Sequence, residues 1–309
     1  MSFDKDHTVI RFDIVKNRRK FFLFSGAIIV LGLLFSLFQG FNLGVDFQAG
    51  TRLDIYVGKE FVPADVEAIL KEQLPEAKFS AVTPYGTNQA YTRFDQTVSS
   101  DKMMEIEQAL KAKYGDQVTK QVATVDPSIA REMVKKAAIA VLIASLGIIV
   151  YIAFRFQWLF GIATVVGLAH DVIIPIALFS VLGLEVDITF IAAILTILGY
   201  SINDKIVIFD RIRENLKTMK SKSVEELEHL VNVSLWQTMR RSVFTVATVF
   251  FTAMAIAILG SESIRNFSLA LVFGLVSGTY SSIFIAAQVW VNLKERSMLK
   301  KKRTTSPSN

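Results

Sequence analysis

Four polar side chains interrupt a long apolar stretch near the middle of the sequence. Residues 188–198 are almost entirely apolar, residues 206–209 are apolar again, and between them lie Ser201, Asn203, Asp204 and Lys205. An ionisable residue inside a membrane helix costs roughly 3 kcal/mol on insertion scales, so such residues are candidates for function. A helix that ended at Asn203 would leave residues 206–209 in water. The pattern therefore predicts a carboxylate buried in the membrane at Asp204.

The spacing around Asp204 predicts which groups could act with it. Ser201 and Asp204 are three residues apart and share a helix face. We expect Lys205 to point elsewhere, with its long stem carrying the ammonium group towards the inner membrane surface. An arginine of the pair 240–241, just before the apolar segment that starts at Val243, would reach Asp204 about one turn inside the preceding helix. Such an ion pair would keep Asp204 ionised until a proton arrived, although an ordinary basic flank explains the same pair.

A second acid lies within another apolar segment. His170 and Asp171 occur inside residues 158–182, and Pro175 follows four residues after the acid. Because proline has no amide hydrogen, the carbonyl of Asp171 loses its helical partner, which predicts a kink with a free acceptor. We expect Asp171 to be a second polar station. The alternative is an acid that bonds to a neighbouring helix and stabilises the bundle.

The composition is that of a membrane protein with several spans. The chain has 309 residues, is 52% hydrophobic and has a mean hydropathy of +0.42, whereas a soluble domain is polar on average. The absence of cysteine excludes disulfides and thiolate metal sites, and three scattered histidines predict no metal cofactor. The net charge of +6 does not indicate nucleic-acid binding, since no folded basic domain with interleaved aromatic residues is found.

Six segments are apolar enough to cross a bilayer, which takes about 20 residues per helix. They are residues 21–38, 137–154, 158–182, 188–209, 243–259 and 267–293. Residues 1–20 are basic near their end, and no small-residue cleavage site follows the first segment, so we expect an uncleaved helix. The predicted fold is an α-helical polytopic membrane protein in which five helices form a bundle over residues 137–293.

The distribution of basic residues predicts the orientation of the spans. Lysine and arginine gather in the predicted loop 210–242 and in the tail 294–309, whereas the turn 183–187 has none and the turn 260–266 has only Arg265. Basic loops stay on the cytoplasmic side of a membrane. We therefore expect both termini in the cytoplasm, the cell membrane as the location, and residues 39–136 on the outer side.

Residues 39–136 form the one sizeable soluble segment. Strand-like patterns occur at residues 51–57, 78–83, 91–98 and 118–125, and helical patterns start at Pro63 and after the expected cap Ser100. The resulting β-α-β-β-α-β order predicts a ferredoxin-like α+β domain. It contains no cluster of catalytic side chains, so we expect a binding or bracing module and no enzyme. In the membrane part, Gly274 and Gly278 form a GxxxG pattern typical of close helix packing.

Four motifs together resemble one family over nearly the whole chain. GVDFQAGT occupies residues 44–51, GLAHDV residues 167–172, GYSINDKIVIFDRIREN residues 199–215 and NVSLWQTMRRS residues 232–242. These are similar to motifs of the SecD/SecF family of protein-export membrane subunits, which is related to the resistance-nodulation-division transporters. The resemblance implies a SecD partner with six more helices, and assistance to the SecYEG channel and the SecA motor.

The resemblance also implies a mechanism and its residues. Proton motive force would help to draw preproteins across the membrane and release them, with protons as the coupling ion and no cofactor. Asp204 and Arg241 match the proton-path residues of the family, Ser201 and Asn203 belong to the same motif, and Asp171 is the second station. Other positions that match family motifs are Gly44, Asp46, Phe47, Gly50 and Gly199.

Two positions depart from the family pattern. Ala49 replaces the first glycine of a glycine pair, and because alanine reaches positive φ only at a cost, this argues against a positive-φ turn there. Lys205 stands where the family often has threonine or serine. Its ammonium group could act on Asp204 or leave for the membrane surface.

We expect Asp204 to take up a proton from the outer side and to lose it inward, which would shift the helices against the partner. Three other functions remain open from the sequence. A small-molecule exporter of the same superfamily would need a longer chain, and an intramembrane aspartyl protease would have YD and GxGD motifs, which HDV and IND do not match. A scaffold that does not couple to protons, with its acids used for packing, fits the sequence as well.

Overall fold

The computed structural model describes residues 10, 12–219 and 223–305. The chain divides into two compact units, of which one is Leu43–Ala140 and the other combines Met1–Asn42 with Val141–Asn309. We call them the sheet unit and the helix unit and describe each by itself. The long helix α5 (Pro127–Arg155) contributes its first part to the sheet unit and its second part to the helix unit.

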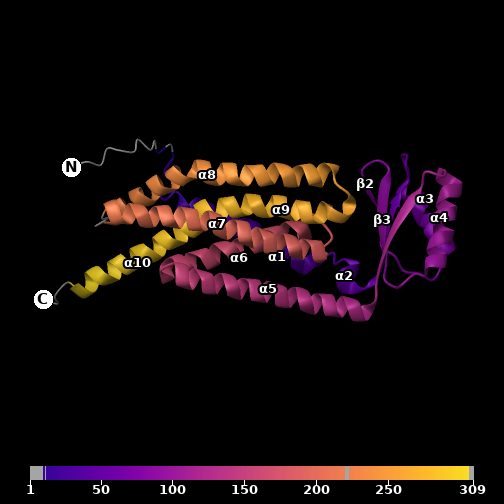
Figure 1. Ribbon diagram of the computed structural model, residues 1–309, viewed down its shortest axis with the longest axis horizontal. Coiled ribbons are helices and arrows are strands. Elements are labelled where there is room, and N and C mark those ends of the chain that lie inside the picture. Colours follow the sequence, from indigo (N-terminus) through magenta and orange to yellow (C-terminus); the bar gives the residue numbers. More distant parts are fainter. Residues whose placement is uncertain (1–9, 11, 220–222, 306–309) are drawn as a thin grey trace. The chain divides into compact units, whose positions relative to one another are not determined.

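The helix unit is built from long apolar helices, shown with the other elements in Figure 1. Besides the end of α5, they are α1 (Arg18–Gln39), α6 (Trp158–Val181), α7 (Ile188–Met219), α8 (Val224–Leu259), α9 (Glu262–Ser281) and α10 (Ala287–Thr305). A π-helical turn, η1 (Ser282–Ala286), joins α9 directly to α10. Within the described residues, six helical segments are long and apolar enough to span a membrane, which confirms the predicted number.

The spanning helices differ in how much of their surface is buried. In α1, α5 and α8, 11% of the most apolar stretch is buried. The buried share of that stretch is 56% in α6 and 67% in the segment Ile264–Lys300. Helix α9 packs against α6, α7 and α8, and α1 packs against α6. The interior of the bundle is therefore formed by α6, α7 and α9, and these are the helices that carry the polar groups.

The cytoplasmic loop predicted over residues 210–242 is instead a helical hairpin. Helix α7 continues to Met219 and α8 begins at Val224, where the Ser223 hydroxyl accepts a hydrogen bond from the Glu226 amide at 3.1 Å. Asn215 Nδ2 joins the two helices by donating to Ser234 Oγ at 2.7 Å. Hydropathy marks where a helix leaves the membrane, but charged residues with good helix propensity let the helix continue in water.

The sheet unit contains one antiparallel sheet in the order β2-β3-β1-β4. Its strands are β1 (Gly50–Tyr56), β2 (Thr83–Tyr85), β3 (Gln89–Phe94) and β4 (Thr119–Val125). Helices α3 (Pro63–Gln73) and α4 (Ser100–Tyr114) lie side by side on the same face of the sheet (Figure 1). The order of elements agrees with the predicted β-α-β-β-α-β succession.

Apolar side chains from both helices and the sheet fill the core of this unit. Leu53 and Ile55 of β1 and Phe94 of β3 meet Leu70 of α3 and Ile106 of α4, and each is fully buried. Burying a side chain of this size contributes about 1.5–3 kcal/mol. Two local predictions were wrong: residue 79 forms only an isolated bridge before β2 begins at Thr83, and α4 is capped by Ser99 instead of Ser100.

A tight turn connects the short helix α2 (Val45–Gln48) to β1. The chain changes from helix to strand within one residue, and Ala49 takes φ 64° there. The turn therefore has positive φ at Ala49, although the alanine argued against it. Gly50 follows with φ 113°, and a Cβ atom at this position would lie 2.2 Å from the carbonyl oxygen of Phe94. Glycine is required at position 50, whereas alanine at position 49 is strained.

Candidate functional site

A buried ion pair joins α6 to α7 in the interior of the helix unit. Lys205 Nζ lies 2.6 Å from Asp171 Oδ2, and both side chains are 0% exposed. The ammonium group also donates to Ser201 Oγ, and to Ser281 Oγ at 3.0 Å. Ser201 Oγ in turn donates to the same Asp171 oxygen. All three ammonium hydrogens have acceptors, so the pair is satisfied within the protein, as a buried charge requires.

The predicted orientation of Lys205 was wrong. The lysine does not extend to the membrane surface, because Ser201 lies four residues before it on the same helix face and holds its ammonium group inward. Gly167 of α6 makes room for the stem, since a Cβ atom there would lie 2.4 Å from Lys205 Cε. The signals in the sequence were the i, i+4 spacing to Ser201 and the glycine four residues before Asp171.

Two consecutive hydroxyl groups face Lys205 where α9 meets the π-helical turn. Ser281 and Ser282 are consecutive, and both have their Oγ atoms within reach of the ammonium group, at 3.0 and 3.4 Å. In a regular α-helix adjacent side chains point about 100° apart. A π-bulge widens one turn and is often found at functional positions in membrane and soluble helices. Sequence reasoning missed this feature.

His170 extends the polar contacts to a third and a fourth helix. Its Nε2 lies 3.0 Å from Ser25 Oγ of α1, and its Nδ1 lies 3.3 Å from both Asp171 Oδ1 and Ser277 Oγ of α9. Pro175 lies inside α6, which continues to Val181, so the proline does not end the helix. A connected set of polar groups thus crosses the bundle from α1 to α7.

Asp204 is a second buried acid with different surroundings. Its side chain is 8% exposed, and among the described residues its Oδ2 atom has no hydrogen-bond partner. The hydroxyls of Ser242 on α8 and Ser282 of η1 face this carboxylate, but neither makes a close hydrogen bond with Oδ2. A hollow of about 10 Å³ lies beside Asp204, which is close to the smallest volume that one water molecule can occupy. Asp204 is therefore an acid with a free oxygen and room for one small donor.

The predicted contact between Arg241 and Asp204 is absent. Arg241 is exposed, and in the part of the chain that the structure describes no hydrogen bond or ion pair joins the two side chains. Helix α8 runs through this position without a break, and the side chain of the next residue, Ser242, is the one that is buried. Arg241 then points about 100° away from the interior.

The remaining candidate residues fall into three groups. Asn203 and Gly199 are exposed on the side of α7 opposite the ion pair. Gly274 contacts α7 so closely that a Cβ atom would lie 2.1 Å from Ile197, whereas a Cβ atom at Gly278 would lie at an ordinary 3.4 Å from Ser201. The motif residues Gly44, Asp46, Phe47 and Gly50 belong to the sheet unit around α2.

The buried polar side chains of the helix unit are of kinds that can bind protons. Across residues 10, 12–219 and 223–305, no three histidine, aspartate or glutamate side chains gather as metal ligands would. The buried groups are instead carboxylates, one ammonium group, an imidazole and several hydroxyls. Such groups hold protons and pass them to one another over hydrogen-bond distances.

Two family models match this sequence. Residues 105–296 match the model described as protein export membrane protein SecD/SecF, C-terminal, and residues 35–55 match the SecD/SecF GG motif. The first match includes both buried acids and Lys205. The second includes the turn with Ala49 and Gly50.

Similar proteins and solved structures carry related descriptions. Protein translocase subunit SecF of Alicyclobacillus acidocaldarius is 45% identical over 296 residues, which is 95% of this chain and 96% of that protein. Protein translocase subunit SecDF of Bacillus subtilis is 40% identical over 94% of this chain and 39% of its own length. A crystal structure of SecDF from Thermus thermophilus, described as a translocon-associated membrane protein, matches with TM-score 0.83 and 33% identity over 94% of this chain and 40% of that one.

Proposed function

Because the chain belongs to the SecD/SecF family of protein-export membrane proteins, we propose that it pairs with SecD and uses the proton gradient to assist preprotein export across the cytoplasmic membrane. The observation that carries this proposal is Asp204, a buried acid in a spanning helix with one carboxylate oxygen free. SecYEG and SecA are the further partners, and the sheet unit engages the emerging preprotein.

The proton step is placed on Asp204 because its charge is the less supported one. Asp171 has Lys205 and Ser201 as partners, whereas Oδ2 of Asp204 has no donor among the described residues. The buried set of Asp171, Asp204 and Lys205 has two carboxylates and one ammonium group. A proton on Asp204 brings the formal charge of this set to zero. The hollow beside Asp204 offers a position from which one water molecule would deliver that proton.

The energy available from each proton limits the size of the movement. One charge that crosses 100 mV releases about 2.3 kcal/mol, so several protons are needed for a large movement of a domain. Protonated, neutral Asp204 no longer attracts Lys205. Asp171 is then the only carboxylate partner of Lys205. The packing of α7 against α9 and η1 would change as a result, and this change would be passed to the partner subunit.

One face of α7 suits a SecD helix. Gly199, Tyr200 and Asn203 are exposed on this face at membrane depth. A side-chain amide facing lipid tails has no hydrogen-bond partner, whereas small and polar residues commonly line contacts between membrane helices. The fusion of the two subunits in SecDF relatives supports a SecD partner. Arg241 stays a predicted member of the proton path that would have to reach Asp204 in another conformation.

The test is preprotein transport in membrane vesicles, with and without an imposed proton gradient, for wild type, Asp204→Asn and Asp204→Glu. We expect the gradient to accelerate transport in wild type, to have no effect in Asp204→Asn, and to keep part of its effect in Asp204→Glu. Membrane levels of the chain and of SecD are measured in the same vesicles. Equal stimulation of wild type and Asp204→Asn would favour the scaffold function.

A further inference from the structure

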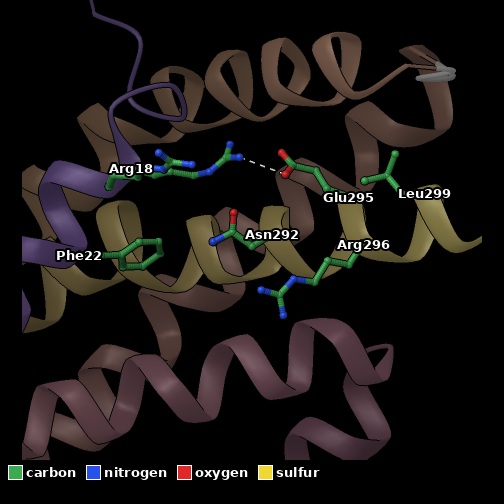
Figure 2. Close-up of a pocket in the computed structure, with 7 residues that line it drawn as sticks. Arg18, Phe22, Asn292, Glu295, Arg296 and Leu299 are labelled. Atoms are coloured by element: carbon green, nitrogen blue, oxygen red, sulfur yellow. Dashed lines mark hydrogen bonds and ion pairs between the residues drawn. The ribbon is translucent and has the colours of Figure 1, made fainter.

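A pocket lined by arginines lies between the first two turns of α1 and the middle of α10. It has a volume of about 270 Å³ and is lined by Arg18, Arg19, Phe22, Asn292, Glu295, Arg296 and Leu299. Figure 2 shows Arg18 reaching across the pocket to Glu295, with Arg296 on the other side and Phe22 at one end. We call this the arginine pocket. It is remote in sequence and chemistry from the buried acids, and nothing in the proposed export function uses it.

The charges in the pocket do not cancel. Arg18 is paired with two carboxylates, Glu228 and Glu295, the latter at 3.0 Å. Arg19 and Arg296 are exposed, and in the described part of the chain neither has a carboxylate partner. The three guanidinium groups and two carboxylates leave a formal charge of +1. A ligand with one negative charge would therefore complement the pocket.

Glu295, one of the residues that line the pocket, has a carboxylate oxygen left unpaired by the described residues. The Oε1 atom of Glu295 is buried and has no donor among the described residues, while its Oε2 accepts from Arg18. Leaving a buried carboxylate oxygen without a donor costs free energy, so a ligand that brings a hydroxyl group would be favoured. A planar guanidinium group binds phosphate oxygens in a bidentate manner. The chemistry required is a phosphodiester with an adjacent hydroxyl donor.

The position of the pocket selects a lipid over a soluble anion. Arg18 begins the first spanning segment, and Leu23 and Phe24, one turn further on, are 74% and 58% exposed, as side chains that face lipid tails are. Phe22 and Leu299 add apolar surface to the pocket itself. Arginine near the end of a spanning helix normally lies at the level of the lipid headgroups. A headgroup can enter here while its acyl chains stay in the bilayer.

We propose that the arginine pocket binds the headgroup of an anionic glycerophospholipid of the phosphatidylglycerol type. The phosphodiester lies between Arg19 and Arg296, and a glycerol hydroxyl donates to Oε1 of Glu295. Arg18 is held by its two carboxylates and positions Glu295 for this contact. The ion pair between Arg18 and Glu295 thus forms one wall of the site (Figure 2).

The experiment measures lipid retention by the purified full-length chain with native mass spectrometry. Detergent micelles contain equal amounts of phosphatidylglycerol, phosphatidylethanolamine and phosphatidylcholine, and a parallel sample contains added glycerol phosphate. We expect phosphatidylglycerol to be retained preferentially, with no displacement by glycerol phosphate. The double variant Arg19→Gln/Arg296→Gln should retain it about tenfold less, since a charge-assisted hydrogen bond contributes that much or more.

The matched control is Lys217→Gln/Arg240→Gln, which removes the same charge at exposed positions outside the pocket. It should retain phosphatidylglycerol as wild type does. Leu299→Trp tests the pocket without a change of charge, because Leu299 is 53% exposed and a larger ring there would fill the space. We expect this variant to retain less phosphatidylglycerol as well. Thermal unfolding of each variant confirms that it is folded.

Several results would overturn the proposal. Equal retention of the three lipids would show that the pocket does not select a headgroup, and preference for phosphatidylethanolamine would show that the ligand is zwitterionic. Displacement by glycerol phosphate would show that a soluble anion is bound instead. An equal loss of phosphatidylglycerol retention in the control double variant would show that only the total charge of the protein matters. None of these results depends on preprotein transport, so failure here leaves the proposed function unaffected.

Discussion

Two buried acids of the helix unit have opposite surroundings, although both lie in spanning helices. Asp171 is satisfied by Lys205 and Ser201, while one oxygen of Asp204 has no donor among the described residues. A satisfied buried pair resists a change of charge, because removal of either partner leaves the other uncompensated. An acid with a free oxygen can gain a proton without breaking a bond. This difference is the reason why we propose that Asp204 binds the proton while Asp171 serves the ion pair.

The structural role of Lys205 can be tested by removing its charge. Lys205→Met should lower the free energy of unfolding by about 3–5 kcal/mol, because Asp171 would remain as a buried carboxylate without its cation. Unfolding in detergent would be followed by circular dichroism. The control is Lys217→Met, an exposed lysine on the same helix, which should change the stability little.

A double variant separates the charge from the packing. Asp171→Leu/Lys205→Met removes both charges, and we expect it to be more stable than Lys205→Met alone. If Lys205→Met unfolded as wild type does, or if the double variant were the least stable of the three, the ion pair would not hold α6 and α7 together as described.

The burial of Asp204 could be predicted from the sequence, but its neighbours could not. The apolar residues on both sides of Asp204 fix its depth in the membrane, whereas partner identity depends on the rotation of each helix. A rotation of one residue places Ser242 inward instead of Arg241, and the polarity of the segment alone does not decide between them. The inward position of Lys205 also depends on Gly167, which is distant in sequence.

At the scale of elements, the turn between α2 and β1 stores strain at an alanine. Ala49 has φ 64° and ψ 173°, a region that is occupied almost only by glycine and costs about 1–3 kcal/mol for other residues. Ala49→Gly should therefore stabilise the sheet unit by about 1 kcal/mol, after the larger loss of chain entropy with glycine is subtracted. Amide hydrogen exchange in β1 of the full chain would measure the change. Faster exchange in Ala49→Gly than in wild type would show that Ala49 is not strained.

The two glycines of the GxxxG pattern give a matched pair of variants on α9. Gly274→Ala would place a Cβ atom 2.1 Å from Ile197 Cδ1 and must push α9 away from α7, whereas Gly278→Ala meets Ser201 at an ordinary distance of 3.4 Å. We expect Gly274→Ala to lose about 1–3 kcal/mol of stability and Gly278→Ala to lose little. Thermal unfolding in detergent would compare the two. Similar losses in both would mean that the helices separate more easily than this packing implies.

A carboxylate in the sheet unit makes part of its stability dependent on pH. Hydrogen bonds from Lys111 and Lys120 hold the pKa of Glu107 below its ordinary value of 4.5. A carboxyl with a lowered pKa contributes stability above its ordinary pKa and loses it as pH falls through the value in the folded protein. Glu107→Gln should then cost about 0.5–1 kcal/mol at pH 7 and almost nothing near pH 3.

Hydrogen exchange in α4 and β4 of the full chain, measured at both pH values, would check this dependence. Glu105, whose pair with Lys102 is 47% exposed on both sides, provides the control. Glu105→Gln should have little effect at either pH, because water screens an exposed pair. A constant cost of Glu107→Gln over the whole range would show that the contact does not depend on ionisation.

At the scale of the whole molecule, the membrane spans were easier to predict than their ends. A bilayer imposes a minimum length of apolar sequence, and six such segments could be found and are confirmed. No comparable constraint marks where α7 and α8 end in water, so their hairpin was predicted as a loop. The π-helical turn was missed because no residue pattern in Ser282–Ala286 distinguishes it from an α-helix.

In the proposed mechanism, export depends on the link between proton binding at Asp204 and the packing of the helices. Asp204 is next to Lys205 in α7, and Lys205 contacts α6 and η1, so a change of charge at one residue reaches three elements. The exposed face with Asn203 lies on the same helix. A movement of α7 is therefore the expected route from the proton to the SecD partner.

The most direct test of this account is infrared difference spectroscopy of the reconstituted chain with its SecD partner when the outer side is acidified. We predict a carboxyl C=O band of a protonated acid that is present in wild type, absent in Asp204→Asn, and unchanged in Asp210→Asn. Asp210 is a half-buried acid on the same helix as Asp204, and it pairs with Arg155 of α5. A band that persists in Asp204→Asn would show that Asp204 does not take up the proton, and would contradict the proposed coupling.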